Sequence, residues 1–267
     1  MIYAAPAYSR NMGGGTEFGM EAYRYLAALY DQLMDDVDYD GWAAYYMKLL
    51  DRAGVVPARL CDCACGTGAL SVRFAAMGAQ VTGVDVSGEM LAVAQDRARE
   101  RGVRAMFVEQ DMCELRLPRP VDALVCACDG VNYLLDDDRL NAFFARAFAS
   151  IKPGGALAFD VSSAYKLERV LGDGFFGEER DDVAYLWSNS FDPEARTVTM
   201  DLTFFIRRPD DLYRRVTETH VQKAHEVGHL TELLAQNGFD NIEVFGDRTF
   251  DAPKPDEQRI HFLARKR

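Results

Sequence analysis

Residues 59–161 alternate between short apolar segments and amphipathic helical segments, and this alternation restricts the chain to one class of fold. Strands are predicted over residues 59–64, 80–86, 105–109, 122–126 and 156–161. Helical periodicity predicts helices between them, over residues 69–77, 87–101 and 136–151. Such alternation specifies a parallel sheet that is covered by helices on both faces. We therefore predict a doubly wound α/β core.

Two other kinds of segment accompany this core. Helices are predicted over residues 17–35 and 39–53, as an N-terminal leader. Residues 183–190, 197–207 and 213–222 are predicted to be three strands with no helix between them, separated by Pro- and Asp-containing turns. A helix over 225–237 and strands over 241–246 and 258–265 follow. We divide the chain into a tail and leader (1–54), a ligand-binding core (55–161), a three-stranded antiparallel insertion or lid (162–224) and the completion of the core (225–267).

Composition disfavours several partners and locations. The formal net charge of the 267-residue chain is -12, which repels the phosphates of nucleic acids and anionic lipids. The chain has no apolar run near the ~20 residues that span a bilayer, and residues 1–15 lack the pattern of a secretory signal. Its six cysteines are not spaced like a disulfide framework, which favours a reducing compartment. We expect a cytoplasmic protein that binds neither nucleic acid nor membranes.

The segment Leu60–Gly68 carries the most informative chemistry. It is a predicted strand that enters a glycine-rich turn and then a helix. Gly66 and Gly68 allow a sharp bend and close approach of a ligand, and the amides at the start of the helix can bind it. Asp85 follows at the end of the second strand, where a carboxylate can accept the hydroxyl protons of a ribose. The G-x-G-x-x-G fingerprint of dinucleotide sites is incomplete, because Ser71 stands at its third glycine.

These residues resemble the first motif of the class I S-adenosylmethionine methyltransferases, (D/E)-x-G-x-G-x-G, with Ala64 in place of the first glycine. Four more segments match motifs of that family in order, namely 84–91 with Asp85, Gln110-Asp111-Met112, Asp129–Leu134 and Lys152–Leu157. The resemblance implies S-adenosylmethionine as cofactor. Asp85 would hold its ribose, Asp111 its adenine amino group and Asp62 its methionine amino group. It also implies a seven-stranded sheet of order 3-2-1-4-5-7-6 with the last strand antiparallel.

The leader adds a narrower likeness. Tyr30–Met34, Val37–Tyr39 and Trp42 resemble the leader of bacterial small-molecule methyltransferases, such as glycine N-methyltransferases and amino-sugar N,N-dimethyltransferases. In such enzymes leader aromatics meet the cofactor or the substrate, although aromatics at helical spacing also commonly pack in a core. The complete set of predicted cofactor contacts is Asp62, Ala64, Cys65, Gly66, Gly68, Asp85, Val86, Met90, Asp111, Met112, Cys128, Tyr30, Tyr39 and Trp42.

The sequence shows no decisive catalytic residue. A sulfonium already carries a good leaving group, so alignment alone can supply much of the rate. Tyr30, Tyr133 and His220 are the candidates, because we expect the acceptor to bind between the leader, residues 129–133 and the insertion. The acceptor would be a small molecule, methylated on nitrogen or oxygen. Alternatives are a nicotinamide or nucleotide-sugar enzyme and a non-catalytic protein that binds an adenosyl ligand, and a homodimer is left open.

No metal site is expected. Cys61, Cys63 and Cys65 alternate along the first strand, and two further cysteines lie on the fourth, but none has the C-x₂-C spacing of zinc sites. Buried thiols of this kind pack as small apolar groups. His225 and His229 are four residues apart but lack the H-E-x-x-H pattern and an evident third ligand.

Overall fold

The computed structural model describes residues 37–267 of the chain. The predicted helix over residues 17–35, with Tyr30, lies outside these described residues. The first helix in them is α2 (Tyr39–Arg52), which begins where the Asp38 carboxylate accepts the Gly41 amide at 2.8 Å. The core then alternates as predicted, through β1 (Arg59–Cys63), α3 (Ala69–Ala76), β2 (Gln80–Asp85), α4 (Gly88–Glu100), β3 (Ala105–Glu109), η1 (Met112–Glu114), β4 (Val121–Cys126), η2 (Gly130–Tyr133), α5 (Asp137–Ser150) and β5 (Ile151–Ser162).

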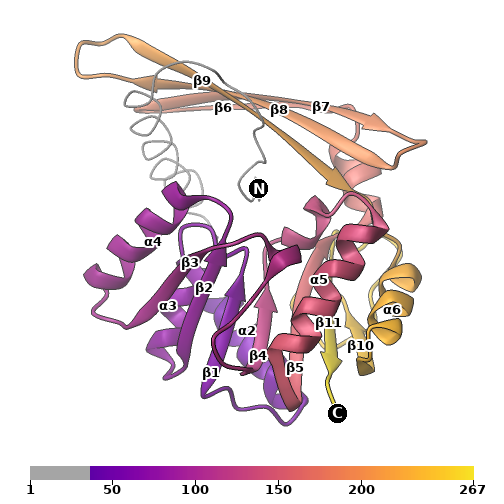
Figure 1. Cartoon of the computed structure of the whole chain (residues 1–267). Helices are drawn as coiled ribbons and strands as arrows, with labels where there is room; N and C mark the ends of the chain where they lie inside the picture. Colours follow the sequence, from indigo (N-terminus) through magenta and orange to yellow (C-terminus); the bar gives the residue numbers. More distant parts are fainter. Residues whose placement is uncertain (1–36) are drawn as a thin grey trace.

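One seven-stranded sheet organises the core (Figure 1). Its remaining elements are α6 (Val227–Gln236), β10 (Asp240–Phe245) and β11 (Arg259–Arg265). The strand order is β10-β11-β5-β4-β1-β2-β3, and β11 is antiparallel to both of its neighbours. The predicted order and the antiparallel last strand are confirmed. The carboxyl ends of β1, β2, β3 and β4 therefore meet at one edge, where doubly wound sheets bind ligands.

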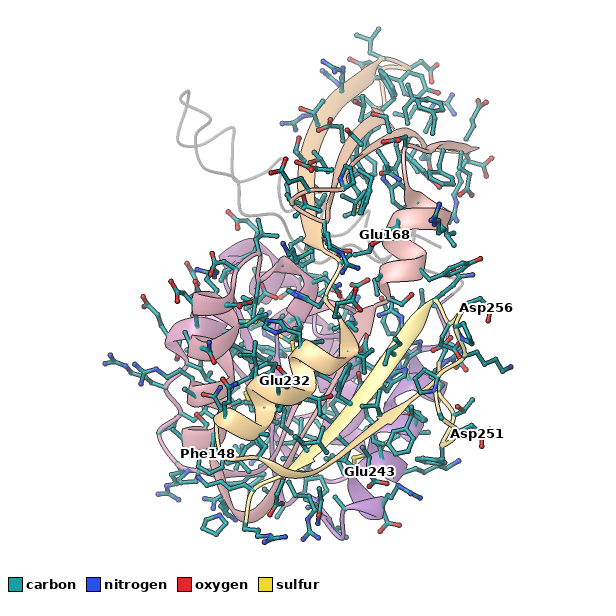
Figure 2. All side chains as sticks on the ribbon, turned by 90° about the vertical axis from the view of Figure 1, so that its right-hand side faces the viewer. Phe148, Glu168, Glu232, Glu243, Asp251 and Asp256 are labelled. Atoms are coloured by element: carbon teal, nitrogen blue, oxygen red, sulfur yellow. The ribbon has the colours of Figure 1, made fainter. Side chains whose placement is uncertain are left out.

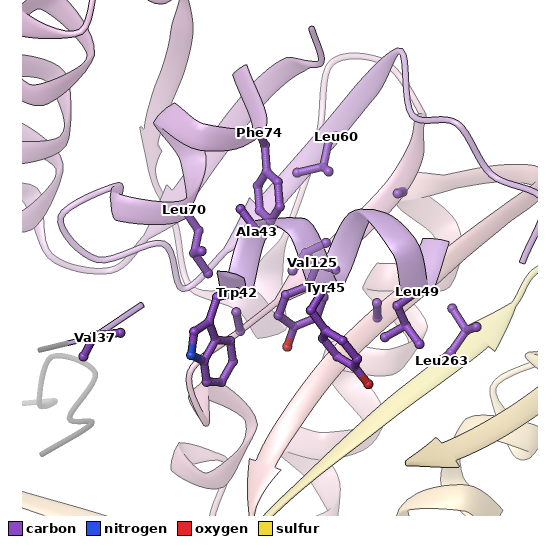
Figure 3. Close-up of a cluster of buried hydrophobic side chains, with 14 of the residues drawn as sticks. Val37, Trp42, Ala43, Tyr45, Leu49, Leu60, Leu70, Phe74, Val125 and Leu263 are labelled. Atoms are coloured by element: carbon purple, nitrogen blue, oxygen red, sulfur yellow. The ribbon is translucent and has the colours of Figure 1, made fainter. Parts of the chain in front are cut away.

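Helices cover both faces of this sheet. On one face α3 contacts both α2 and α4, while α5 and α6 pack together on the other. Alternate strand residues serve the two faces: Leu60 joins the cluster under α2, and its neighbours Cys61 and Cys63 join the cluster under α5. Figure 3 shows the first cluster, in which Leu49 of α2 lies beside Leu263 of the sheet. Full burial of one such apolar side chain stabilises the fold by roughly 1.5–3 kcal/mol.

The insertion forms a separate antiparallel sheet of order β6-β7-β8-β9. The three predicted strands are present as β7 (Val183–Asp192), β8 (Thr197–Arg207) and β9 (Tyr213–Lys223). The structure adds an edge strand, β6 (Phe175–Arg180). Nearly all of β6 is exposed, so it has no apolar alternation, and only its pairing with β7 defines it as a strand.

The insertion lies over the carboxyl ends of the parallel strands (Figure 1). Helix η3 (Lys166–Leu171) leads from β5 into it and contacts β7 and β8, while β9 contacts η2. In Figure 2, Glu168 on η3 lies between the two sheets, whereas Glu232 on α6 lies beside the core. The helices described here include none that is both long and apolar enough to cross a membrane.

Candidate functional site

The turn after β1 is held in the left-handed conformation at three positions. The φ angles are +54° at Ala64, +53° at Gly66 and +71° at Gly68. A Cβ on Gly68 would lie 2.8 Å from the Cβ of Ala94 in α4, whereas no atom lies within 4 Å of the equivalent position on Gly66. Gly68 thus lets α4 pack closely, and Gly66 leaves open space beside the backbone. Ala64 adopts the left-handed conformation despite its methyl group.

Asp85 ties the end of β2 to this turn. Its Oδ2 accepts the Gly66 amide at 2.8 Å, and its Oδ1 accepts the Ser87 amide at 3.0 Å. The residue is 3% exposed, and burial raises the pKa of its carboxyl. Ser87 caps α4 by accepting the Met90 amide, so the helix starts next to Asp85. A buried carboxylate therefore stands where a ribose could donate its hydroxyl protons.

Asp62 of β1 is buried beneath the same turn. Its Oδ2 accepts the Ser71 hydroxyl of α3 at 2.5 Å. Burial raises the pKa of Asp62 to about 7. Ser71 occupies the position of the third glycine of a dinucleotide site, so this serine supports a carboxylate instead of opening room for a pyrophosphate. The local chemistry thus disfavours the nicotinamide alternative.

A cavity of about 440 Å³ opens at the carboxyl edge of the sheet, a volume typical of small-molecule sites. Its lining comes from the turns after β1 to β4, from the start of α5 and from β9 of the insertion. The lining residues are Ala64, Val84, Asp85, Val86, Gln110, Asp111, Met112, Gly130, Tyr133, Leu134, Leu135, Asp136, Arg139, Thr219, His220 and Val221.

An ion pair lies at the end of the cavity near β3. Asp111 is 2.9 Å from Arg139 of α5 and accepts the Cys113 amide at 2.8 Å. Burial alone would raise the pKa of Asp111, but the Cys113 amide and the Arg139 guanidinium together hold it below its usual value. The carboxylate thus stays ionised beside the Met112 side of the cavity. Arg139 was not predicted from the sequence, because an arginine in an amphipathic helix is usually a solvated surface residue.

The buried carboxylate of Asp160 holds the segment after β4 in place. Cys128 and Asp129 both have left-handed φ angles, of +58° and +55°. Asp160 of β5 accepts both of their amides, at 2.8 and 3.0 Å, and accepts the Tyr46 hydroxyl at 2.6 Å. Arg259 of β11 forms ion pairs with both Asp129 and Asp160. Each strained residue costs about 1–3 kcal/mol, so this bonding keeps the wall of the cavity in place. Sequence reasoning missed Asp160 and Arg259, since neither belongs to a motif.

The insertion contributes a row of hydrogen-bonded polar side chains to the opposite wall of the cavity. The Tyr133 hydroxyl of η2 is 3.1 Å from Nδ1 of His220, and Nε2 of His220 is 3.2 Å from Oε2 of Glu218. His220 and Glu218 are two residues apart on β9, so they point to the same face of that strand. The structure thus joins two sequence-predicted candidates, Tyr133 and His220, and adds Glu218, which the sequence analysis did not select.

The structure divides the predicted cofactor contacts into two groups. Those that line the cavity are Ala64, Asp85, Val86, Asp111 and Met112. Of the others, Asp62 lies in β1, and Cys65, Gly66 and Gly68 lie in the turn after it. Cys128 lies half-buried after β4, and Met90 is buried in the core cluster.

The leader aromatics of α2 are placed differently. Trp42 is 2% exposed in the core cluster, with the Arg259 guanidinium 5.1 Å from its ring centroid. Tyr39 packs under Arg73. Neither residue lines the described cavity, because α2 packs on the face of the sheet rather than at its edge. Trp42 therefore packs in the core, which is the alternative to a cofactor contact. Tyr30 lies outside the described residues.

The cysteines and histidines of the described residues lie in several different environments. All six cysteines are free, and Cys61, Cys63 and Cys126 are buried in the sheet. His229 pairs with Asp137 at 2.8 Å. Within residues 37–267, no group of three or more His, Cys, Asp or Glu side chains is arranged to hold a metal ion.

Comparison with known proteins agrees with this site. A family model described as a methyltransferase domain matches residues 60–155, which include the turn after β1, Asp85 and Asp111. A methyltransferase homologue from Geobacillus sp. (strain WCH70) is 37% identical over 245 residues, covering 91% of this chain and 99% of its own; its name specifies no acceptor. A more distant relative is a glycine/sarcosine N-methyltransferase from Halorhodospira halochloris, 28% identical over 142 residues, about half of each chain.

The fold comparison gives the same family. The crystal structure of an S-adenosylmethionine-dependent methyltransferase from Clostridium acetobutylicum ATCC 824 superposes with a TM-score of 0.84 and 30% identity, covering 92% of this chain and 99% of that one. The doubly wound sheet, with its antiparallel last strand and acidic carboxyl edge, defines the class I methyltransferase architecture. This chain belongs to the class I S-adenosylmethionine-dependent methyltransferases, and its cofactor is S-adenosylmethionine.

Proposed function

We propose that this methyltransferase transfers the methyl group of S-adenosylmethionine directly to a small molecule bound beside Tyr133 and His220. The observation that carries the proposal is the cavity of about 440 Å³, which has Asp85 and Asp111 among its lining residues and Tyr133 and His220 as well. The first two suit an adenosine, and the last two offer a polar surface to a second ligand. Both ligands would then meet at residues 128–133.

Each carboxylate suits a different part of the cofactor. Asp85, which is buried and already bonded to the turn, would accept from the ribose hydroxyls. Asp111, kept ionised by the Cys113 amide and Arg139, would accept from the adenine amino group. Asp62 would face the methionine ammonium, which is the kind of partner that a buried carboxyl with a raised pKa needs in order to ionise. With the cofactor bound in this way, the chain aligns the acceptor and excludes water.

Three observations support a small-molecule acceptor. The cavity has the volume of a small-molecule site. The net charge of -12 opposes binding of a nucleic acid. A relative that aligns with about half of the chain is named for the N-methylation of glycine and sarcosine. The free cysteines support a reducing compartment, so we propose that the protein acts in the cytoplasm.

The test separates an enzyme from a protein that only binds the cofactor. Calorimetry should show binding of both S-adenosylmethionine and S-adenosylhomocysteine. Incubation with fractionated pools of small metabolites should release S-adenosylhomocysteine with at least one fraction. Binding without release from any fraction would indicate a non-catalytic sensor of the cofactor and would refute the proposed transfer.

A further inference from the structure

We propose that Tyr133, oriented by His220 and Glu218, takes the proton from a hydroxyl group of the acceptor, which makes this enzyme an O-methyltransferase. This inference rests on the proposed function and adds the chemical class of the acceptor. It starts from the continuous chain of contacts Tyr133 Oη to His220 Nδ1, 3.1 Å, and His220 Nε2 to Glu218 Oε2, 3.2 Å.

His220 in the middle of this row of contacts is buried, and Tyr133 and Glu218 at its two ends are half-buried. The His220 side chain is 0% exposed and that of Glu218 is 12% exposed. Tyr133 is half-buried and lines the cavity together with His220. The two rings meet edge-on, with centroids 6.0 Å apart, so packing holds the tyrosine in place as well. Of the three groups, Tyr133 is thus the one placed to touch an acceptor, while His220 and Glu218 are positioning residues.

The order of the partners fixes the direction of each hydrogen bond. The Glu218 carboxylate can only accept, so Nε2 of His220 carries the proton of the neutral ring. Nδ1 is then a lone pair, and it accepts from the Tyr133 hydroxyl. With its proton directed toward His220, the tyrosine oxygen can act toward the cavity as a proton acceptor. Without Glu218, either tautomer of His220 could form, and this direction would be lost.

The methyl transfer is coupled to two proton transfers. As the acceptor oxygen attacks the methyl carbon, its O–H bond breaks and its proton passes to Tyr133 Oη, while the tyrosine proton passes to His220 Nδ1. The C–S bond of S-adenosylmethionine breaks, and its electron pair stays on sulfur. The products are the methyl ether of the acceptor, S-adenosylhomocysteine and one proton. That proton resides on the His220 imidazolium, which the Glu218 carboxylate stabilises until solvent removes it.

A hydroxyl acceptor needs this arrangement, and a neutral amine does not. An amine attacks with an existing lone pair, and its proton can leave to water afterwards. A hydroxyl is a weak nucleophile until its proton is being removed, so a base placed beside it accelerates the step by roughly 10²–10⁴-fold. An amine that is already neutral would not use the proton relay through His220 and Glu218, so this relay favours a hydroxyl acceptor.

The first experiment identifies the bond that is formed without requiring the acceptor in advance. The protein is incubated with S-adenosylmethionine carrying a ¹³C-labelled methyl group and with fractionated bacterial metabolites, and the product methyl is observed by ¹³C NMR. We expect the chemical shift of an O-methyl carbon. An N-methyl or C-methyl product would overturn this inference and leave the proposed function standing, whereas failure to release S-adenosylhomocysteine from any fraction would refute the proposed function itself.

The second experiment tests the three residues with matched controls. Tyr133→Phe should lower kcat for the active fraction roughly 100-fold or more and change cofactor affinity by no more than about twofold. Tyr213→Phe, at an exposed end of β9, should leave both kcat and cofactor affinity unchanged. Glu218→Gln should lower kcat, and Glu194→Gln, in the exposed turn between β7 and β8, should not. Unchanged kcat in Tyr133→Phe would overturn the proposal.

A spectroscopic signature separates positioning from general stability. In ¹⁵N NMR, with the His220 signal assigned by its loss in His220→Gln, the wild-type ring should carry its proton on Nε2, and Glu218→Ala should reduce that preference. A wild-type ring protonated on Nδ1 would contradict the direction of the chain, even if all variants were folded and less active.

Discussion

The carboxylate of Asp85 accepts the backbone amide of Gly66 at 2.8 Å, so the end of β2 and the turn after β1 form one unit. The two residues are 19 positions apart in the sequence. The bond places an acceptor oxygen beside the space that Gly66 leaves open. Loss of Asp85 should therefore affect the cofactor both directly, through the ribose, and indirectly, through the shape of the turn.

Asp85→Ala should weaken binding of S-adenosylmethionine. One hydrogen bond to a charged group contributes about 1.5–3 kcal/mol, which corresponds to roughly a 10- to 100-fold rise in Kd. Calorimetry on the folded variant measures it. Glu100→Gln, at the exposed end of α4, removes a charge without touching the turn and should bind normally. Equal affinities of wild type and Asp85→Ala would show that Asp85 does not hold the cofactor.

Gly68→Ala and Gly66→Ala should fail in different ways. Both force an alanine into the left-handed region, at roughly 1–2 kcal/mol. Gly68→Ala also drives a methyl to 2.8 Å from Ala94, adding about 1–3 kcal/mol of overpacking, so its melting temperature should fall further. Gly66→Ala meets no atom within 4 Å, and its main effect should be about a tenfold loss of cofactor affinity. A Gly66→Ala protein that is less stable than Gly68→Ala would contradict this division.

Arg259→Leu should destabilise the fold strongly. Arg259 is buried and forms ion pairs with two buried carboxylates, those of Asp129 and Asp160. Its removal leaves both without their cation, which costs about 3–5 kcal/mol. The matched control is Arg52→Leu, whose partner is the exposed Glu243 and which should cost at most about 1 kcal/mol. Urea unfolding compares the two, and similar losses would mean that the buried ion pairs do not stabilise the segment after β4.

Because of Asp62, part of the free energy of unfolding should be lost as the pH rises. Its pKa is raised to about 7 in the fold, against about 3.9 in an unfolded chain. Between these two pH values the Asp62 carboxyl is protonated in the folded chain but ionised in the unfolded chain. Its proton binding therefore stabilises the fold fully below about pH 4, and this stabilisation is lost as the pH rises through about 7. Each unit of difference corresponds to about 1.4 kcal/mol at most. Asp62→Asn, which can still accept from Ser71, should therefore gain stability relative to wild type from pH 5 to pH 8 in urea unfolding; a constant difference would refute the raised pKa.

Much of the core follows from the sequence because its signals are local. The alternation of strands and helices, the glycine-rich turn and Asp85 depend on neighbouring residues and on the two periodicities of 2 and 3.6. These signals gave the doubly wound sheet, and the family resemblance gave its strand order, which the structure confirms. Strand β6 escaped because an exposed edge strand carries no apolar alternation. Trp42 shows the same limit, since helical spacing alone does not distinguish a core aromatic from a ligand contact.

The sequence by itself determined the fold class, the cofactor motif and the acidic residues at the end of β2 and after β3. Only the tertiary structure decided which distant side chains complete the site. Asp160 and Arg259 reach the segment after β4 from strands that are separated by about a hundred residues, and Glu218 is aligned with Tyr133 only because the insertion folds back over the sheet. Contacts of this kind leave no periodic pattern in the sequence, because each depends on one long-range packing arrangement rather than on neighbouring residues.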